Sequence, residues 1–131
     1  MTYLFDTTAV LAHYLDEPGA ERVAHIVEDS EARIVTTSIT TCEMARKISE
    51  LLDDPAAARS VALEYLQLFD SVVPIDVTIC TRAFELSATS SSRVPIVDAL
   101  IAAAAQVSEA VLVHRDQHFL SMKSVRQKYL G

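Results

Sequence analysis

Four acidic residues stand near the ends of apolar segments, although they are spread over almost the whole chain. Asp6 directly follows the apolar run at 2–5, and two residues separate Asp116 from the run at 110–113. Glu43 and Asp98 fall in the first turns of two predicted helices. Carboxylates are the ligands that hard divalent cations prefer, and such cations can polarise a phosphodiester and position an attacking water. This chemistry requires a fold that gathers the four side chains.

The elements that must position these acids are short strands alternating with helices. Apolar and β-branched runs predict strands at 2–5, 33–37, 71–75 and 110–113, with Pro74 marking an edge or a strand end. The alternation indicates a three-layer α/β/α fold with a mainly parallel central sheet of four to five strands. Sites in such sheets form outside the carboxyl ends of the strands, at a switch in strand order. We therefore expect all four acids at one edge of the sheet.

Each acid also has a purely structural explanation. Asp6 can cap the following helix, Asp116 can be a turn residue, and the helix dipole favours Asp98 in a first turn. Thr40 and Glu43 fit a capping box, with Thr40 as the helix cap. These explanations do not account for the convergence of the acids on one edge. Carboxylates gathered beside apolar surface repel one another, and a divalent cation would neutralise them.

The bulk properties of the chain exclude several classes of protein. Its 131 residues predict one domain, 1–131, and the net charge of −7 argues against a broad surface that neutralises nucleic-acid phosphates. No apolar run is long enough for a membrane span, and the first residues do not resemble a secretory signal. Cys42 and Cys80 lie in no CxxC motif, which favours reduced thiols in a cytoplasmic protein.

Two polar segments complete the local interpretation. The stretch 87–93 predicts a helix end and a loop before Pro95. Near the C-terminus, Lys123, Arg126 and Lys128 occur without an acidic residue among them, which predicts a solvated helix face. The three cations alone do not predict a nucleic-acid surface.

Four segments carry a resemblance to a known family: YLFDTTAVLAHYL, TTSITTCEMARKI, PIVDALIAAAAQ and VLVHRDQHF. The chain resembles PIN-domain proteins, specifically the small single-domain toxins of VapBC toxin–antitoxin modules, and the last two segments are the most specific. The resemblance implies an endoribonuclease that depends on Mg²⁺, or alternatively Mn²⁺. It maps the acidic metal site onto Asp6, Glu43, Asp98 and Asp116, with Thr8 in a supporting role. It also implies a cognate antitoxin that occludes the site, and a homodimer.

Two histidines depart from the family pattern. The family commonly has Thr or Ser two residues before the last Asp, where this chain has His114, and often an acid two residues after it, where this chain has His118. Imidazoles therefore replace a hydroxyl and a carboxylate around Asp116, which puts the metal environment and the metal preference in question. We expect His118 to be exposed or to lie outside the ligand set, with a role as a soft-metal ligand as the less favoured alternative.

Other functions remain open from the sequence. The chain could be a housekeeping RNA-processing nuclease with the same domain, or a degenerate PIN domain that only binds a partner. A phosphatase would place a second Asp two residues after the first, where Thr8 stands, and a receiver domain would place a lysine after the last strand. Neither of these two classes fits.

Overall fold

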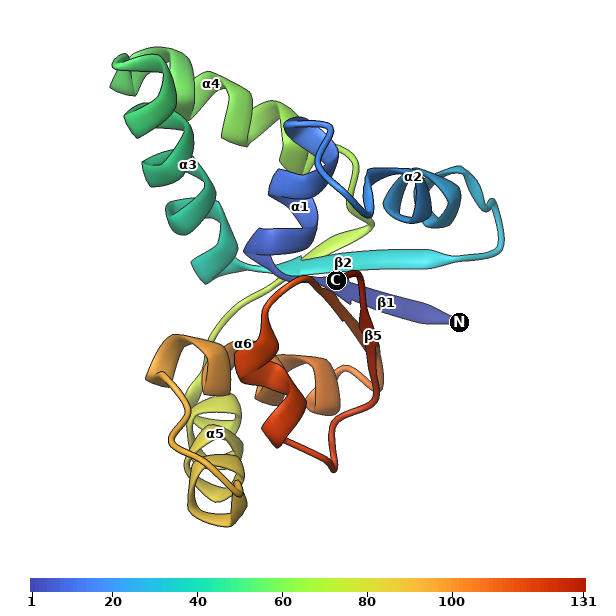
Figure 1. Ribbon diagram of the computed structural model, residues 1–131, viewed down its shortest axis with the longest axis vertical. Helices are drawn as coiled ribbons and strands as arrows, with labels where there is room; N and C mark the ends of the chain where they lie inside the picture. The colour runs from blue at the N-terminus through green and yellow to red at the C-terminus, as the bar shows by residue number, and fades with distance from the viewer.

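The computed structural model describes residues 1–131 and has a five-stranded parallel sheet between two layers of helices (Figure 1). The strands are β1 (Thr2–Phe5), β2 (Arg33–Thr37), β3 (Ser71–Val73), β4 (Val111–His114) and β5 (Gln127–Tyr129). The helices are α1 (Thr7–Tyr14), α2 (Ala20–Glu28), α3 (Ser38–Leu52), α4 (Pro55–Leu66), α5 (Val77–Thr89) and α6 (Ile96–Val107), with a 3₁₀ helix η1 (Gln117–Ser121). The α/β/α prediction is confirmed.

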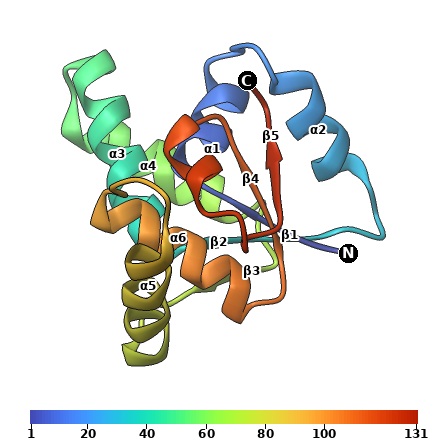
Figure 2. The ribbon, with the colours of Figure 1, turned by 60° about the horizontal axis from the view of Figure 1, so that its bottom comes forward.

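The strand order creates a switch point beside the central strand. The order is β3-β2-β1-β4-β5, and every neighbouring pair is parallel. The chain adds β2 and β3 on one side of β1, and then crosses over to add β4 and β5 on the other side (Figure 2). The carboxyl ends of β1 and β4 therefore meet where ligand sites form in such sheets. Strand β3 lies at an edge, as Pro74 predicts.

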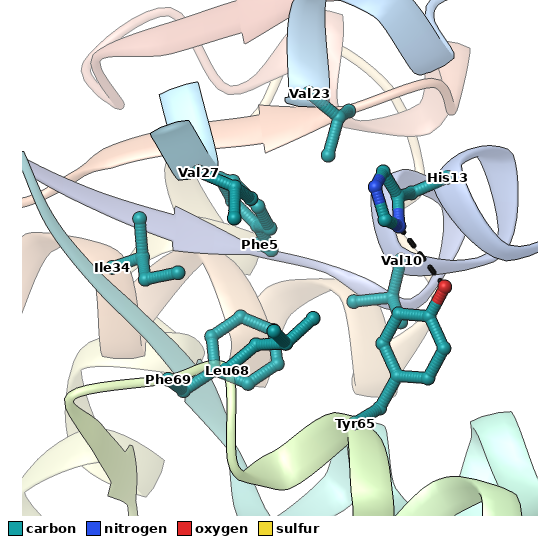
Figure 3. A pocket seen from close by; sticks show the side chains of 9 residues that line it. All are labelled: Phe5, Val10, His13, Val23, Val27, Ile34, Tyr65, Leu68 and Phe69. Atoms are coloured by element: carbon teal, nitrogen blue, oxygen red, sulfur yellow. Dashed lines mark hydrogen bonds between the residues drawn. The ribbon is translucent and has the colours of Figure 1, made fainter. Parts of the chain in front are cut away.

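Two separate cores hold the helices on the sheet. Helices α5 and α6 pack on one face around a cluster of 16 buried residues, in which Ala102 to Ala105 are fully buried and let α6 approach the strands closely. Helices α1 to α4 cover the other face around 13 buried residues. Figure 3 shows a small apolar pocket on that second face, where the hydroxyl of Tyr65 lies 3.0 Å from Nδ1 of His13. The sheet is thus held in place from both sides.

Side-chain caps fix the starts of several helices, and one predicted cap is wrong. Asp54 accepts a hydrogen bond from Ala57 N–H at 3.1 Å, as its place before Pro55 predicts. Helix α3 does not begin at Thr40: its N-cap is Thr37, whose hydroxyl accepts from Thr40 N–H at 3.2 Å. Since β2 ends at the same residue, strand passes directly into helix, and the capping-box role predicted for Glu43 does not apply.

The prediction of a helix near the C-terminus is also wrong. Residues Gln127–Tyr129 form β5 and pair with Leu112 to His114 of β4 (Figure 2). Main-chain bonds flank this pairing, with Leu112 N–H donating to Arg126 O at 2.9 Å and Leu130 N–H donating to His114 O at 2.7 Å. The unpaired edge of β4 decides the conformation of this segment, and the local sequence does not contain that information.

The predicted helix end and loop before Pro95 are confirmed. Helix α5 ends at Thr89, and α6 begins after Pro95, with a loop between them. Cys42 and Cys80 are free and exposed. No helix combines the length and the apolar composition that crossing a membrane requires.

Candidate functional site

Asp6 is held rigidly at the carboxyl end of the central strand. It is 3% exposed and caps α1, because its Oδ1 accepts from Ala9 N–H at 2.9 Å. The Thr8 hydroxyl donates to the same carboxylate, at 2.7 Å from Oδ1 and 2.9 Å from Oδ2. Thr8 Oγ1 also accepts from Arg115 N–H at 2.8 Å, so one hydroxyl joins the start of α1 to the segment after β4. Asp6 is thus both a helix cap and a candidate ligand.

Glu43 reaches the same region from α3. The Thr7 hydroxyl donates to Glu43 Oε1 at 2.6 Å, across 36 positions of sequence. Because α3 follows β2, and β2 pairs with β1, the first turns of α1 and α3 lie side by side. The sequence does not reveal the role of Thr7, since a threonine in a first helical turn is ordinary.

The side chains of Asp98 and Asp116 both contact the ring of one histidine, His118. His118 Nδ1 lies 3.3 Å from Asp98 Oδ2 and 3.1 Å from Asp116 Oδ1. One possible ligand atom from each of the three residues lies within 4.8 Å of the others. Asp116 Oδ1 also accepts from His118 N–H at 2.9 Å, which caps η1. As expected, His118 is largely exposed, yet its ring nitrogen faces both carboxylates.

The pKa values show that the acids act on one another. Burial raises the pKa of Asp6 to about 7, against the hydrogen bonds from Thr8 and Ala9, and the charges of Asp116 and Asp98 raise it further. Burial also raises the pKa of Asp98 to about 6, with Asp116 and Glu43 raising it and His118 lowering it. Asp98 and Asp116 thus interact with each other and with Asp6, and Glu43 interacts with Asp98, so the like charges of these carboxylates repel one another.

His114 supports the site from the core instead of facing it. Its side chain is fully buried, and its Nδ1 accepts from Asp116 N–H at 3.2 Å. Nδ1 must therefore be unprotonated, so Nε2 carries the proton and donates to Gln127 Oε1 at 2.8 Å. Burial lowers the pKa of His114, which favours this neutral ring. The ring also stacks on Tyr129, with centroids 5.4 Å apart.

Gln127 extends this support, and sequence reasoning missed it. Its side-chain amide donates to the carbonyl oxygens of Phe119, Met122 and Val125 at 3.0, 3.2 and 3.4 Å. Gln127 and His114 together tie η1 and β5 to the main chain of Asp116. The sequence around Gln127 carries no signal of this role, because its partners lie on other segments of the chain.

The donor set fits a divalent cation. The four carboxylates carry like charges that repel one another, and they provide the oxygen ligands that Mg²⁺ and Mn²⁺ bind. Burial and like charges raise the pKa values of Asp6 and Asp98, and a cation bound beside them would lower these pKa values, so that metal binding would release protons. The side chain of Arg115 does not complete the site, because its Nη1 lies 3.6 Å from Glu17 Oε1.

The fold is shared with several solved structures at low sequence identity. A chain of VapBC2 from Rickettsia felis, bound to a DNA fragment from the promoter, superposes with a TM-score of 0.79 at 16% identity over 100% of both chains. A chain of VapBC-1 from nontypeable Haemophilus influenzae gives 0.78 at 20% identity, covering 99% of this chain and 98% of that one. VapBC-5 from Mycobacterium tuberculosis, of the VapBC family of toxin–antitoxin systems, gives 0.62 at 20% identity, with coverages of 98% and 97%.

Sequence comparison identifies the family directly. A search of curated proteins finds no match. The PIN domain family model matches residues 3–124, which include all four predicted acids together with His114 and His118. This chain belongs to the PIN domain family.

Proposed function

We propose that this protein is a divalent-metal-dependent endoribonuclease and the toxin of a type II toxin–antitoxin pair. Membership of the PIN domain family implies nuclease activity. The observation that carries the metal-dependent mechanism is the set of mutually repelling carboxylates at the switch point between β1 and β4. A cation neutralises such a set and brings the nucleic-acid phosphate to a surface that is otherwise acidic.

In this proposal Asp6, Glu43, Asp98 and Asp116 hold Mg²⁺, with Mn²⁺ as the alternative. The bound ion supplies charge stabilisation for the phosphodiester and lowers the pKa of a water. The protein contributes position: Thr8 orients Asp6, and Thr7 orients Glu43. Held in this way, the carboxylates need little rearrangement when the ion enters, which lowers the free-energy cost of assembling the site.

Cleavage of a fluorescent RNA by the purified protein tests the catalytic part. We expect activity with Mg²⁺ or Mn²⁺ and none in excess chelator. Asp6→Asn and Asp98→Asn should each lower the rate by more than about a hundredfold, because a ligand to the ion is lost. Glu64→Gln on α4 is the control, since Glu64 is exposed and its side chain has no partner in the site. Full cleavage in chelator, or by either Asn variant with intact circular dichroism, contradicts the mechanism.

The toxin assignment has its own support and test. The structural relatives are chains from VapBC complexes, one of them described as a toxin–antitoxin system. We expect induced expression in a bacterial cytoplasm to arrest growth, Asp98→Asn to abolish the arrest, and the product of the neighbouring gene to bind and rescue. We expect light scattering to give the mass of a homodimer.

The outcomes also separate the alternative functions. RNA cleavage without growth arrest points to a housekeeping processing nuclease. Binding of RNA or a protein partner without metal-dependent cleavage points to a degenerate PIN domain that serves as a binding module. Either result overturns the toxin assignment and leaves the fold unaffected.

A further inference from the structure

His118 is placed as a ligand would be, although its side chain is 59% exposed. Its main chain is fixed, because its N–H donates to Asp116 Oδ1 and its carbonyl accepts from the Ser121 hydroxyl at 3.2 Å. From this anchored position, Nδ1 points to carboxylate oxygens on two different elements, the first turn of α6 and the segment after β4. One ring nitrogen of His118 thus lies within 3.3 Å of carboxylate oxygens from two elements, where the three side chains could share a cation.

We propose that His118 is a nitrogen ligand of the cation held by Asp98 and Asp116, and that it makes the site select Mn²⁺ over Mg²⁺. The inference rests on the proposed metal-dependent function and adds to it a ligand and a metal preference. It replaces the sequence-based expectation that His118 lies outside the ligand set.

The chemistry of the donors supports this selectivity. Mg²⁺ prefers oxygen ligands and keeps much of its water, whereas imidazole suits the later first-row metals and binds Mn²⁺ better than it binds Mg²⁺. Replacing an oxygen donor by Nδ1 therefore weakens the site for Mg²⁺ relative to Mn²⁺. The third ligand atom is already present, since Asp98, Asp116 and His118 offer theirs within 4.8 Å.

The other histidines of the chain show that this placement is specific. Both ring nitrogens of His114 are used inside the core, by Asp116 N–H and by Gln127. His13 Nδ1 lies 3.0 Å from the Tyr65 hydroxyl, at the apolar pocket (Figure 3). His25 is exposed on α2 and contacts no carboxylate within 4 Å. Only His118 brings a ring nitrogen to the acidic cluster.

Metal binding to the full chain, without RNA, tests the proposal. Mn²⁺ binding is followed by electron paramagnetic resonance, and Mg²⁺ binding by competition against Mn²⁺. We expect His118→Ala to lower the ratio of Mn²⁺ to Mg²⁺ affinity by about tenfold. His118→Asp, which supplies an oxygen donor at the same place, should lower the ratio while keeping Mg²⁺ bound. His25→Ala is the matched control and should leave both affinities unchanged.

A spectroscopic signature distinguishes ligation from a general structural effect. Electron spin-echo modulation of the bound Mn²⁺ should show coupling to ¹⁴N in the wild-type protein and in His25→Ala, and none in His118→Ala. Absence of this coupling in the wild type overturns the proposal. So does a His118→Ala variant that keeps its metal affinities but has a raised KM for RNA, because His118 would then contact the substrate phosphate.

The same measurements separate failure of this proposal from failure of the proposed function. If Mn²⁺ binds to the wild type and is lost in Asp98→Asn, while His118→Ala leaves the ratio of Mn²⁺ to Mg²⁺ affinity unchanged, the acidic metal site stands and only the role of His118 is overturned. If the wild type binds neither cation, and Asp98→Asn changes nothing, the proposed metal-dependent function is overturned together with the role of His118.

Discussion

The candidate site has two halves that fix their carboxylates by different means. In the threonine half, Asp6 and Glu43 accept hydrogen bonds from the hydroxyls of Thr8 and Thr7, and Asp6 is almost completely buried. In the histidine half, Asp98 and Asp116 are more exposed, with side chains 16% and 26% accessible, and both face His118.

The two halves differ in the donor atoms that surround a bound cation. A hydroxyl orients a carboxylate and keeps an all-oxygen environment, whereas an imidazole adds a competing nitrogen donor. Four similar acids can therefore form a site whose two halves differ in metal preference and in rigidity. Substitutions within each half test how much each kind of partner contributes to the stability of the protein and to metal binding.

The largest effect on the free energy of unfolding is expected at Asp6, the most buried acid of the threonine half. Its pKa in the folded protein, about 7, lies above its ordinary value of 3.8, so folding favours the protonated form. In the metal-free protein, protonated Asp6 stabilises the fold, and this stabilisation is fully present below about pH 4. It is lost as the pH rises through 7, and the total loss in the free energy of unfolding is roughly 4 kcal/mol. Asp6→Asn removes this loss, because the amide stays neutral.

Urea unfolding in chelator at pH 4 and pH 8 measures this difference. The wild-type protein should lose much more free energy of unfolding between the two values than Asp6→Asn does. Asp98, whose pKa is also raised, is present in both proteins, so the comparison isolates Asp6. Parallel pH dependence in the two proteins would show that the burial of Asp6 has no energetic consequence.

The second-largest effect on the free energy of unfolding is expected at His114, which holds the main chain of Asp116 in the histidine half. Replacement by Leu removes the side-chain partner of Asp116 N–H and of Gln127 Oε1, both partly buried, and should lower the free energy of unfolding by about 3 kcal/mol. Asn keeps an acceptor near the position of Nδ1, so it can still receive Asp116 N–H, as asparagine does in turns.

Comparison of the two His114 variants separates packing from positioning. We expect His114→Asn to keep its Mn²⁺ affinity within about threefold of the wild type and His114→Leu to lose about tenfold. Equal loss in both variants would mean that the bond to Asp116 N–H does not position the carboxylate. Unfolding curves recorded beside the titrations show how much of each effect is stability alone.

A smaller effect is expected at Thr8, which links the two halves. Thr8→Val leaves Arg115 N–H without its acceptor and removes a hydrogen bond that lowers the pKa of Asp6. The free energy of unfolding should fall by about 1–2 kcal/mol, and the pKa of Asp6 should rise further. Thr8→Ser keeps the hydroxyl and should behave as the wild type. Chemical-shift titration of the Asp6 carboxyl distinguishes the two variants, and an unchanged midpoint in Thr8→Val would contradict the assignment.

The smallest effect is expected for the side chain of Arg115. Only its main-chain N–H joins the halves, while its guanidinium forms a partly exposed ion pair with Glu17. Arg115→Ala should therefore change the free energy of unfolding by less than about 0.5 kcal/mol. Thermal unfolding of Arg115→Ala and Glu17→Gln measures this change. A larger loss of stability in either variant would show that the side chain of Arg115 also helps to connect the two halves.

Local patterns in the sequence predict the framework of the fold and the edge of the sheet near which the four acids lie. Strand runs and helical periodicity are short-range features, and parallel order brings the residues after each strand to one edge. Contacts between distant segments are beyond such patterns. Nothing near Thr7 indicates that Glu43 will lie beside it, and nothing near Gln127 indicates that it will pair with His114.

The errors have the same physical origin. The segment around β5 has little strand character of its own, and it becomes a strand because β4 offers it unpaired main-chain groups. The sequence pattern indicates Thr40 as the cap of α3, but β2 runs directly into this helix, and the cap is Thr37, three residues earlier. His114 is a core residue because Tyr129 and Phe119 enclose it, one of them from β5.

The bond between His114 and Gln127 has a consequence for the order in which the site forms during synthesis. A nascent chain that has just passed Asp116 carries all four carboxylates but lacks the glutamine that ties His114 to η1 and β5. The histidine half therefore cannot reach its final geometry until Gln127 has left the ribosome. Translation therefore brings the structural support for Asp116 last, after all four carboxylates.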